Sequence, residues 1–192
     1  MYNRGNIITE DEKNLISNWA TNIIYPRMKS MSNRLFNYIM LDTDKNILQL
    51  IWTIKNRIIE KEGLHGYKQE ETLRDFLIYL PKGSHVSKHV DPNKNNLIHT
   101  RFNVFVTSPL KGCVTYYDNN IVDTTNLTYA LCRSGIDEHY ITTNEDDNIS
   151  RITLSFGFLL PTEKLDELTS DKNIGTYKFY PLTYRPLNNE NS

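Results

Sequence analysis

The sequence predicts a mainly β protein, an antiparallel sandwich or jelly roll with α-helices at its N-terminal end. Two observations carry this prediction. Apolar residues recur at helical spacing in the first third of the chain, and from about residue 72 the apolar pattern changes to a period of two. Many short alternating segments follow one another without long helices between them, which is typical of antiparallel sheets that pack face to face.

Two helices are expected before the β region. Thr9 and Glu12 have the spacing of a capping box, in which each side chain accepts a hydrogen bond from the other residue's amide at a helix start. A second helix carries an apolar stripe through Ile47, Ile51, Ile54 and Ile58, between Asp44 and the terminating Gly63. Because the helices precede the strands, we expect them to cover one outer face of a sheet.

The β region is divided by turn residues such as Pro81-Lys82-Gly83 and Asp118-Asn119-Asn120. The expected strands are 72–80, Phe102–Thr107, Cys113–Tyr117, Thr128–Cys132 and Ile152–Leu159. We predict a single domain over residues 1–192, with a helical cover over about 1–70 and a β core over about 72–161. A C-terminal strap over 162–192 contains a short helix (Glu163–Leu168) and an aromatic segment (Tyr177–Tyr184).

His89 and Asp91 form a candidate metal-binding pair. In an extended chain, residues two apart point to the same side, so both side chains can reach one ion, while Val90 points away and is expected in apolar packing. Pro92 then turns the chain into a polar loop. His139 lies far downstream, so several antiparallel strands can bring it back beside the pair. Two histidines and one carboxylate leave coordination positions of Fe(II) open.

Arg151 begins an alternating strand in which Arg151, Thr153 and Ser155 share one face, while Ile152, Leu154 and Phe156 share the other. An arginine directed into an otherwise apolar interior is costly unless an anion meets it. A carboxylate bound through two oxygens is the natural partner, and the neighbouring hydroxyls can add hydrogen bonds. The alternative is that Arg151 lies on the solvent face of an ordinary strand.

These residues together resemble a known family. The stretch from Tyr79 to Phe158 is similar to the catalytic core of the 2-oxoglutarate and Fe(II)-dependent dioxygenases, in particular the prolyl 4-hydroxylase-like branch. The matching positions are Tyr79-Leu80-Pro81-Lys82-Gly83, His89, Asp91, Arg101, Lys111-Gly112, His139 and Arg151. The resemblance implies a double-stranded β-helix (jelly-roll) core that uses Fe(II), 2-oxoglutarate and O2, with ascorbate as a supporting reductant. It also implies hydroxylation of a substrate with release of succinate and CO2.

The same resemblance assigns roles to individual residues. His89, Asp91 and His139 would be the iron ligands and the catalytic centre. Arg151 would bind the C5 carboxylate of 2-oxoglutarate with Thr153 in support, and Tyr79 and Asn103 would face the cosubstrate. Two departures concern the substrate class: a glycine pair of the family is reduced to Lys111-Gly112, and Phe105 stands where some members have a cosubstrate-binding tyrosine.

Two other interpretations of the site remain open. Two histidines and one carboxylate also hold Zn2+ with a bound water, which would make the protein a hydrolase. Alternatively, the chain is a non-catalytic jelly-roll binding module. Among the other histidines, His85 is expected at the pocket rim or behind the metal ligands, His65 in a loop with a structural or solvated role, and His99 at the surface.

Charge, cysteine content and apolar runs limit the partners and the cellular compartment that we expect. The formal net charge is −1, which favours neither duplex nucleic acid nor an anionic membrane. The resemblance to the prolyl 4-hydroxylase-like branch implies a protein or peptide substrate, prolyl first, with a small molecule as the alternative; the oligomeric state is left open. Cys113 and Cys132 are expected to be buried, reduced thiols. With no signal-peptide pattern or bilayer-length apolar run, a soluble cytoplasmic protein is predicted.

Overall fold

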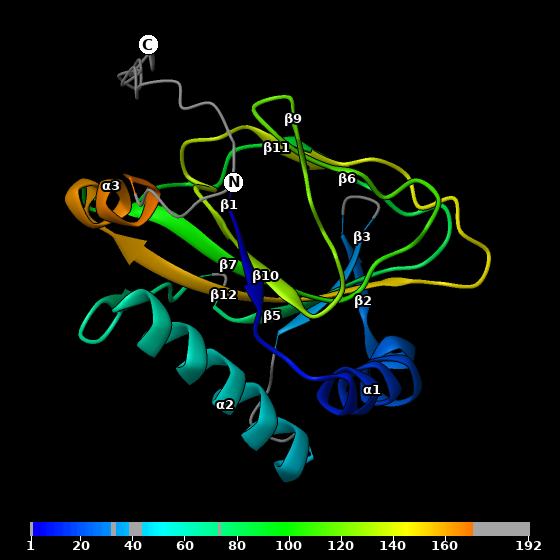
Figure 1. Cartoon of the computed structure of the whole chain (residues 1–192). Coiled ribbons are helices and arrows are strands. Elements are labelled where there is room, and N and C mark those ends of the chain that lie inside the picture. The colour runs from blue at the N-terminus through cyan, green and yellow to red at the C-terminus, as the bar shows by residue number, and fades with distance from the viewer. Residues whose placement is uncertain (1, 32–33, 39–43, 73, 171–192) are drawn as a thin grey trace.

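The computed structural model describes residues 2–31, 34–38, 44–72 and 74–170, and two antiparallel sheets form its centre (Figure 1). The larger sheet has the strand order β1 (Tyr2–Asn6), β10 (Thr128–Cys132), β7 (Ile98–Thr107), β12 (Arg151–Leu160), β5 (Phe76–Leu80), β3 (Arg34–Tyr38) and β2 (Lys29–Met31), and β4 (Lys68–Gln69) also pairs with β12. The smaller sheet has the order β6 (Val86–His89), β11 (His139–Ile141), β8 (Thr115–Tyr117) and β9 (Asn120–Val122). The predicted mainly β architecture with helices is confirmed.

The two long helices lie on one side of the larger sheet, and the smaller sheet lies on the other (Figure 1). Helix α1 (Glu10–Trp19) continues into a π-helical turn (Ala20–Ile24) and a 3-10 turn (Tyr25–Arg27), and helix α2 is Lys45–Glu62. A third helix, α3 (Thr162–Ser170), follows β12 and includes the predicted Glu163–Leu168 segment.

Both predicted helix starts have the expected caps. The Glu12 amide donates to Thr9 Oγ1 (3.2 Å), and the Thr9 amide donates to Glu12 Oε2 (2.9 Å), which completes the capping box. Arg57 of α2 donates to Glu12 Oε1 (2.7 Å), so the cap also ties the two helices together, and this bond lowers the pKa of Glu12. Helix α2 starts at Asp44, whose carboxylate accepts from the Asn46 amide, and ends at Gly63, which has φ +61.

The two faces of the larger sheet have opposite chemistry. On β12, Ile152, Leu154 and Phe156 join an apolar core with residues of α1 and α2. The alternate residues, Arg151, Thr153 and Ser155, line a pocket between the sheets. The alternation read from the sequence for this strand is therefore observed.

The first third of the chain is less helical than predicted, because it supplies four strands, β1 to β4. They are short and three of them lie toward the ends of the sheet or off its main path. Such strands are held by backbone pairing and have little of the apolar alternation that identifies a central strand.

The strand expected from residue 72 begins instead at Phe76. The Glu70 carboxylate accepts hydrogen bonds from the amides of Thr72 (2.6 Å) and Arg74 (2.9 Å), which curls the chain before the strand. The aromatic part of the predicted C-terminal strap lies outside the described residues.

A buried ion pair attaches α2 to the start of β5. Lys55 is 1% exposed, and its Nζ lies 2.6 Å from Asp75 Oδ2 and 2.8 Å from Gln69 Oε1. We expect Lys55→Met to lower the free energy of unfolding by roughly 3 kcal/mol, because it leaves a largely buried carboxylate without its cation. Urea denaturation measures this change. Lys13→Met, which breaks an exposed pair with Glu10, is the control and should cost less than about 1 kcal/mol; equal losses would contradict the assignment.

Candidate metal centre

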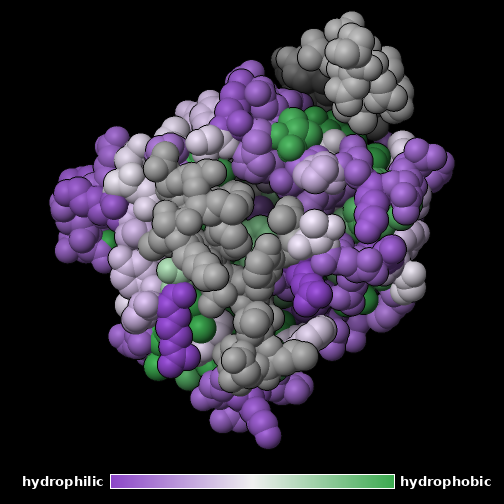
Figure 2. Space-filling view, turned by 180° about the vertical axis from the view of Figure 1, so that it is seen from behind, coloured by the Kyte–Doolittle hydropathy of each residue, from purple (hydrophilic) through white to green (hydrophobic). Residues whose placement is uncertain are grey.

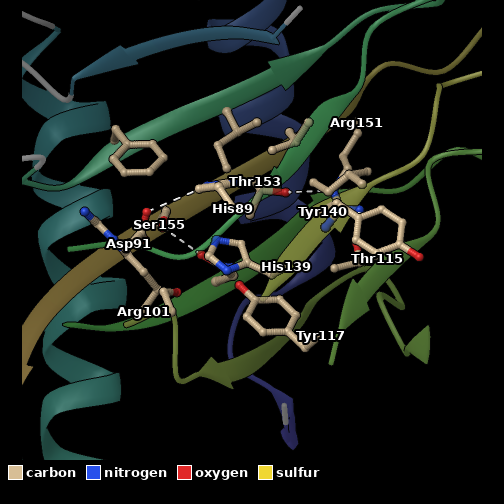
Figure 3. Close-up of a pocket in the computed structure, with 16 residues that line it drawn as sticks. His89, Asp91, Arg101, Thr115, Tyr117, His139, Tyr140, Arg151, Thr153 and Ser155 are labelled. Carbon is tan, nitrogen blue, oxygen red and sulfur yellow. Dashed lines mark hydrogen bonds and ion pairs between the residues drawn. The ribbon is translucent and has the colours of Figure 1, made fainter. Parts of the chain in front are cut away.

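Strand pairing in the smaller sheet brings the predicted ligands together. His89 is the last residue of β6, His139 is the first of β11, and the two are direct partners across the ladder. Asp91 follows two residues after His89. The ligand atoms of these three side chains all lie within 4.8 Å of one another, and they face the pocket between the sheets (Figure 3).

Backbone carbonyl groups set the tautomer of both histidines. His89 Nδ1 lies 2.7 Å from Ser87 O, and His139 Nδ1 lies 3.0 Å from Asp137 O. A carbonyl oxygen accepts a hydrogen bond, so each Nδ1 carries the proton and each Nε2 has its lone pair available for a metal. His89 Nε2 is 3.7 Å from Asp91 Oδ1. This donor set of two imidazole nitrogens and one carboxylate oxygen fits a divalent transition metal.

His139 is held on two further sides. The ring of Tyr117, its neighbour on β8, stacks on the imidazole with centroids 4.7 Å apart and an angle of 5° between the planes. Asp137, whose carbonyl orients His139, is itself buried and accepts hydrogen bonds from Arg133 at 2.9 and 2.5 Å. The orientation of the His139 ring is thus set by protein groups alone.

His99 lies behind Asp91 and is buried, contrary to the expectation of a surface residue. His99 belongs to β7, which begins at Ile98 and not at Phe102, where the strand was expected to start. The His99 residue is 1% exposed. Its Nδ1 faces Asp91 Oδ2 at 3.7 Å. Burial, with a further contribution from Arg101, lowers the pKa of His99 to about 4, so the imidazole is neutral near pH 7.

Arg151 is a buried cation among neutral groups. Its Nη1 donates to Thr115 Oγ1 (2.6 Å) and to Cys113 O (3.1 Å), and its Nε donates to Thr153 Oγ1 (3.2 Å). The ring of Phe105 lies 5.3 Å from the guanidinium carbon. Burial lowers the pKa of Arg151, although a guanidinium stays charged. In the described part of the chain, no carboxylate forms an ion pair with Arg151.

Arg101, the other arginine of the pocket, is already neutralised. Its Nη2 lies 3.3 Å from Glu70 Oε2, and its Nη1 donates to Arg74 O (2.5 Å). The guanidinium lies between the ring of Phe76, 4.5 Å away, and the backbone of Gly157. A Cβ on Gly157 would lie 2.7 Å from Arg101 Nη1, so a side chain at this position would displace the guanidinium. The two buried arginines of the pocket therefore differ: Arg101 has a carboxylate partner, whereas the partners of Arg151 are neutral.

No family model matches this sequence, and no curated protein matches it either. Solved structures do. A prolyl-4-hydroxylase from Pseudomonas putida superposes with a TM-score of 0.63 at 11% identity, covering 82% of this chain and 91% of that one. A viral collagen prolyl hydroxylase from Paramecium bursaria Chlorella virus-1, in complex with 2-oxoglutarate, gives 0.62 at 12% identity, covering 82% and 94%. A Trichoplax adhaerens prolyl hydroxylase bound to a hypoxia-inducible-factor peptide fragment gives 0.62 at 12%, covering 85% and 84%.

The chain has the prolyl 4-hydroxylase fold. The predicted jelly-roll core is thereby confirmed. In this prolyl 4-hydroxylase fold, the candidate metal ligands lie at the ends of β6 and β11 that open toward the pocket, and Arg151 lies at the start of β12 (Figure 3).

Two predicted orientations are wrong. Tyr79 lies on the helix side of β5, where it stacks on Tyr25 with ring centroids 4.6 Å apart, so it does not face the pocket. The alternation of β5 instead turns Phe76 and Ile78 toward the pocket. Val90 is 47% exposed and is not packed in the interior. Strand β6 ends at His89, so Val90 lies just beyond the strand.

Asn103 lines the pocket as predicted and accepts from Ser155 Oγ (2.7 Å), so it lies beside the alternating face of β12. Sequence reasoning missed Thr115, Tyr117 and Ser134 as pocket residues. For Thr115 and Tyr117 a signal existed, because they alternate within a predicted strand. Nothing in the local sequence pointed to Ser134, which lies in the turn between β10 and β11.

Both cysteines are free and buried, as predicted. Burial raises the pKa of Cys113 and raises that of Cys132 to about 12. Because the thiolate is the reactive form, we expect a chromogenic disulfide reagent at roughly pH 8 to label the native protein at least about tenfold more slowly than the urea-unfolded protein. Rapid labelling of the native protein would contradict this burial.

Proposed function

We propose that the protein is a 2-oxoglutarate and Fe(II)-dependent dioxygenase that hydroxylates its substrate. One observation carries the proposal: a buried arginine with only neutral partners among the described residues shares a pocket with two histidines and a carboxylate. A buried cation is costly without an anion. A 2-oxo acid with a second carboxylate supplies that anion while its other end reaches the metal.

His89, Asp91 and His139 would hold the iron. When bound, Fe(II) lets O2 oxidise 2-oxoglutarate to succinate and CO2, with one oxygen atom of O2 going to succinate and the other into a C–H bond of the substrate. The protein's part is to orient the two histidines through the carbonyl groups of Ser87 and Asp137, so that Nε2 of each ring faces the metal position.

Arg151 would bind the far carboxylate of 2-oxoglutarate. Thr115 and Thr153 hold its guanidinium in place, and Phe105 packs against it. The walls of the pocket between Arg151 and the metal ligands include the apolar side chains of Ile78, Val86 and Ile141, which suit the methylene groups of the cosubstrate. Phe105 replaces the tyrosine that some family members have at this position. Its ring packs against the Arg151 guanidinium, and the hydroxyl groups of Thr115 and Thr153 already orient that cation.

A zinc hydrolase and an inert binding module explain less of the structure. Each accounts for the metal residues, or for the fold, but leaves the cost of burying Arg151 without compensation. A ligand that binds the metal at one end and carries an anionic group at the other accounts for both the metal-binding residues and the buried Arg151.

For the substrate, we propose a residue of a protein or peptide, prolyl first. The support is that the Trichoplax neighbour, a prolyl hydroxylase, has a peptide fragment bound. The net charge of −1 adds no reason to prefer nucleic acid. No helix in the described ranges is long and apolar enough to cross a membrane.

The proposed cosubstrate and metal are tested by anaerobic titration. Apo-protein mixed with Fe(II) should give a visible metal-to-ligand charge-transfer band when 2-oxoglutarate is added, because the 2-oxo acid chelates the metal through two oxygens. Asp91→Ala and His139→Ala should lose the band, since each removes a ligand of a three-residue site. Tight Zn2+ binding without any band in the wild-type protein would favour the hydrolase instead.

The role of Arg151 is tested with two ligands that differ at one end. We expect Arg151→Met to weaken binding of 2-oxoglutarate to the Fe(II) protein roughly 10- to 100-fold, the worth of charge-assisted hydrogen bonds. 2-Oxobutyrate has the same chelating group but no far carboxylate, so its affinity should change much less. Competition for the charge-transfer band measures both. An equal loss for both ligands would show that the substitution damages the pocket generally and would contradict the assignment.

Substrate class is tested by coupling peptide oxidation to succinate release. A proline-containing peptide pool should yield products that gain one oxygen atom, in proportion to the succinate formed. Succinate release that no peptide stimulates, but that a small molecule does, would overturn the peptide proposal while leaving the chemistry intact.

A further inference from the structure

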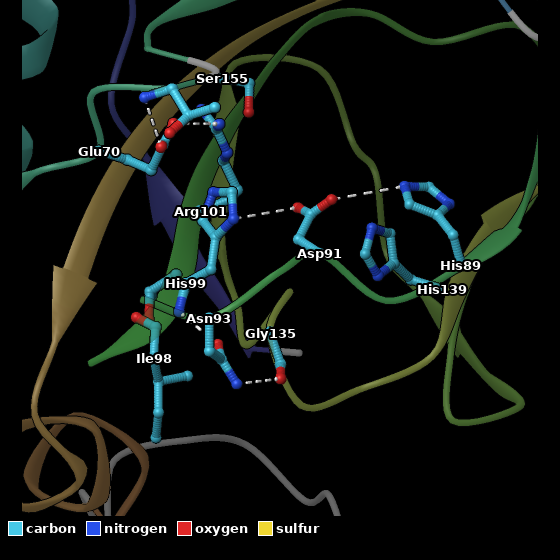
Figure 4. A network of polar contacts seen from close by, with 12 residues as sticks. Glu70, His89, Asp91, Asn93, Ile98, His99, Arg101, Gly135, His139 and Ser155 are labelled. Atoms are coloured by element: carbon cyan, nitrogen blue, oxygen red, sulfur yellow. Dashed lines mark hydrogen bonds and ion pairs between the residues drawn. The ribbon is translucent and has the colours of Figure 1, made fainter. Parts of the chain in front are cut away.

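The carboxylate of Asp91 has two faces in this structure. Its Oδ1 points toward His89 Nε2, 3.7 Å away, on the side of the metal-ligand set. Its Oδ2 points toward His99 Nδ1, also 3.7 Å away, on the far side (Figure 4). One oxygen is therefore directed to the metal position and the other to a buried imidazole.

The tautomer of His99 follows from its surroundings. A lone pair on Nδ1 would face the negative Asp91 oxygen and repel it, whereas an N–H there donates toward it. His99 Nε2 is buried and has no hydrogen-bond partner among the described residues, so a proton there would be an unsatisfied buried donor. Both considerations place the proton on Nδ1, directed at Asp91.

The backbone of His99 is tied to both loops that carry metal ligands. The His99 amide donates to Asn93 Oδ1 (2.9 Å), and the Asn93 side-chain amide donates to Gly135 O (2.8 Å). The Gly135 amide in turn donates to His99 O (2.8 Å). Asn93 lies in the loop after Asp91, and Gly135 lies in the turn before His139. We call His99, Asn93 and Gly135 the His99 clamp.

The clamp is tightly packed. A Cβ on Gly135 would lie 1.8 Å from Asn93 Oδ1 and 2.9 Å from the His99 amide nitrogen, so any side chain there would break the clamp. The Asp91 amide also donates to Ser134 O (2.8 Å), which joins the same two loops beside the carboxylate. The loop after β6 and the turn before β11 are thus hydrogen-bonded to each other and to β7.

We propose that His99 is a positioning residue for the metal site: its Nδ1–H, 3.7 Å from the outer oxygen of Asp91, attracts that oxygen, so that the carboxylate would offer its other oxygen to the metal. This inference rests on the proposed function, because it assumes that Asp91 is a metal ligand. It goes further, since it gives a role to a histidine that lies outside the ligand set. Outer groups that orient a ligand change metal affinity about 10- to 100-fold when removed.

Three substitutions of His99 separate positioning from packing. Asparagine places an amide N–H where Nδ1 of histidine lies, glutamine places it where Nε2 lies, and leucine has similar bulk without a donor. Mn(II) binding is measured in the absence of 2-oxoglutarate and substrate, by the electron paramagnetic resonance signal of the free ion. The melting temperature of each apo-protein is measured in parallel.

We expect His99→Leu and His99→Gln to raise the Kd for Mn(II) about 10- to 100-fold. His99→Asn should stay within roughly threefold of the wild type. This ranking of Mn(II) affinities should not follow the ranking of the apo-protein melting temperatures. If His99 acted only through packing, the affinities would follow stability and would not depend on where the N–H donor lies. If His99→Leu does not fold, the comparison of Asn with Gln alone decides.

Equal Mn(II) affinities for the Asn and Gln variants would overturn the inference and leave the proposed function standing. A wild-type protein that binds no Mn(II) would overturn both. Variants that bind as tightly as the wild type, whatever their stability, would show that Asp91 needs no support from His99.

Discussion

The central constraint in this molecule is that a charged guanidinium, Arg151, lies on the inner face of a strand whose outer face is apolar. The strand alternation of β12 forces this arrangement: Ile152, Leu154 and Phe156 must pack under α1 and α2, so Arg151 must point between the sheets. Burying that cation is favourable only if a ligand later compensates it. This placement directs the guanidinium toward Thr115 of the smaller sheet and the Cys113 carbonyl, which accept its hydrogen bonds.

The candidate metal ligands and the Arg151 guanidinium line the same pocket but belong to different parts of the fold. The ladder between β6 and β11 places His89 beside His139, and extended geometry adds Asp91. The larger sheet contributes Arg151 and Thr153, and the smaller sheet contributes Thr115, which holds the guanidinium. The pocket therefore depends on the two sheets facing each other. The guanidinium of Arg101 in the same pocket is paired with the Glu70 carboxylate, whereas Arg151 has no carboxylate partner among the described residues.

The sequence predicted those features that depend on periodicity and on local capping. The alternation of β12 placed Arg151 and Thr153 on the pocket side, and the Thr9, Asp44 and Gly63 signals marked helix ends that the structure shows. The spacing of His89 and Asp91 suggested one ion, and the structure brings their ligand atoms together with that of His139.

Features that depend on long-range contacts were missed. Strands β1 to β4 are short, and their residues show no clear alternation before the partners are known. Tyr79 was assigned by resemblance against the alternation of its own strand, which turns Ile78 inward and Tyr79 toward Tyr25. His99 has no sequence signal at all, because its burial depends on where Asn93 and Gly135 fold back upon β7.

A crystal structure with Mn(II) and 2-oxoglutarate bound would locate both groups at once. We expect the metal bound by His89, Asp91 and His139, and the far carboxylate of 2-oxoglutarate paired with the Arg151 guanidinium, with the Arg101–Glu70 pair intact. A far carboxylate bound at Arg101, or a metal bound elsewhere, would contradict this expectation.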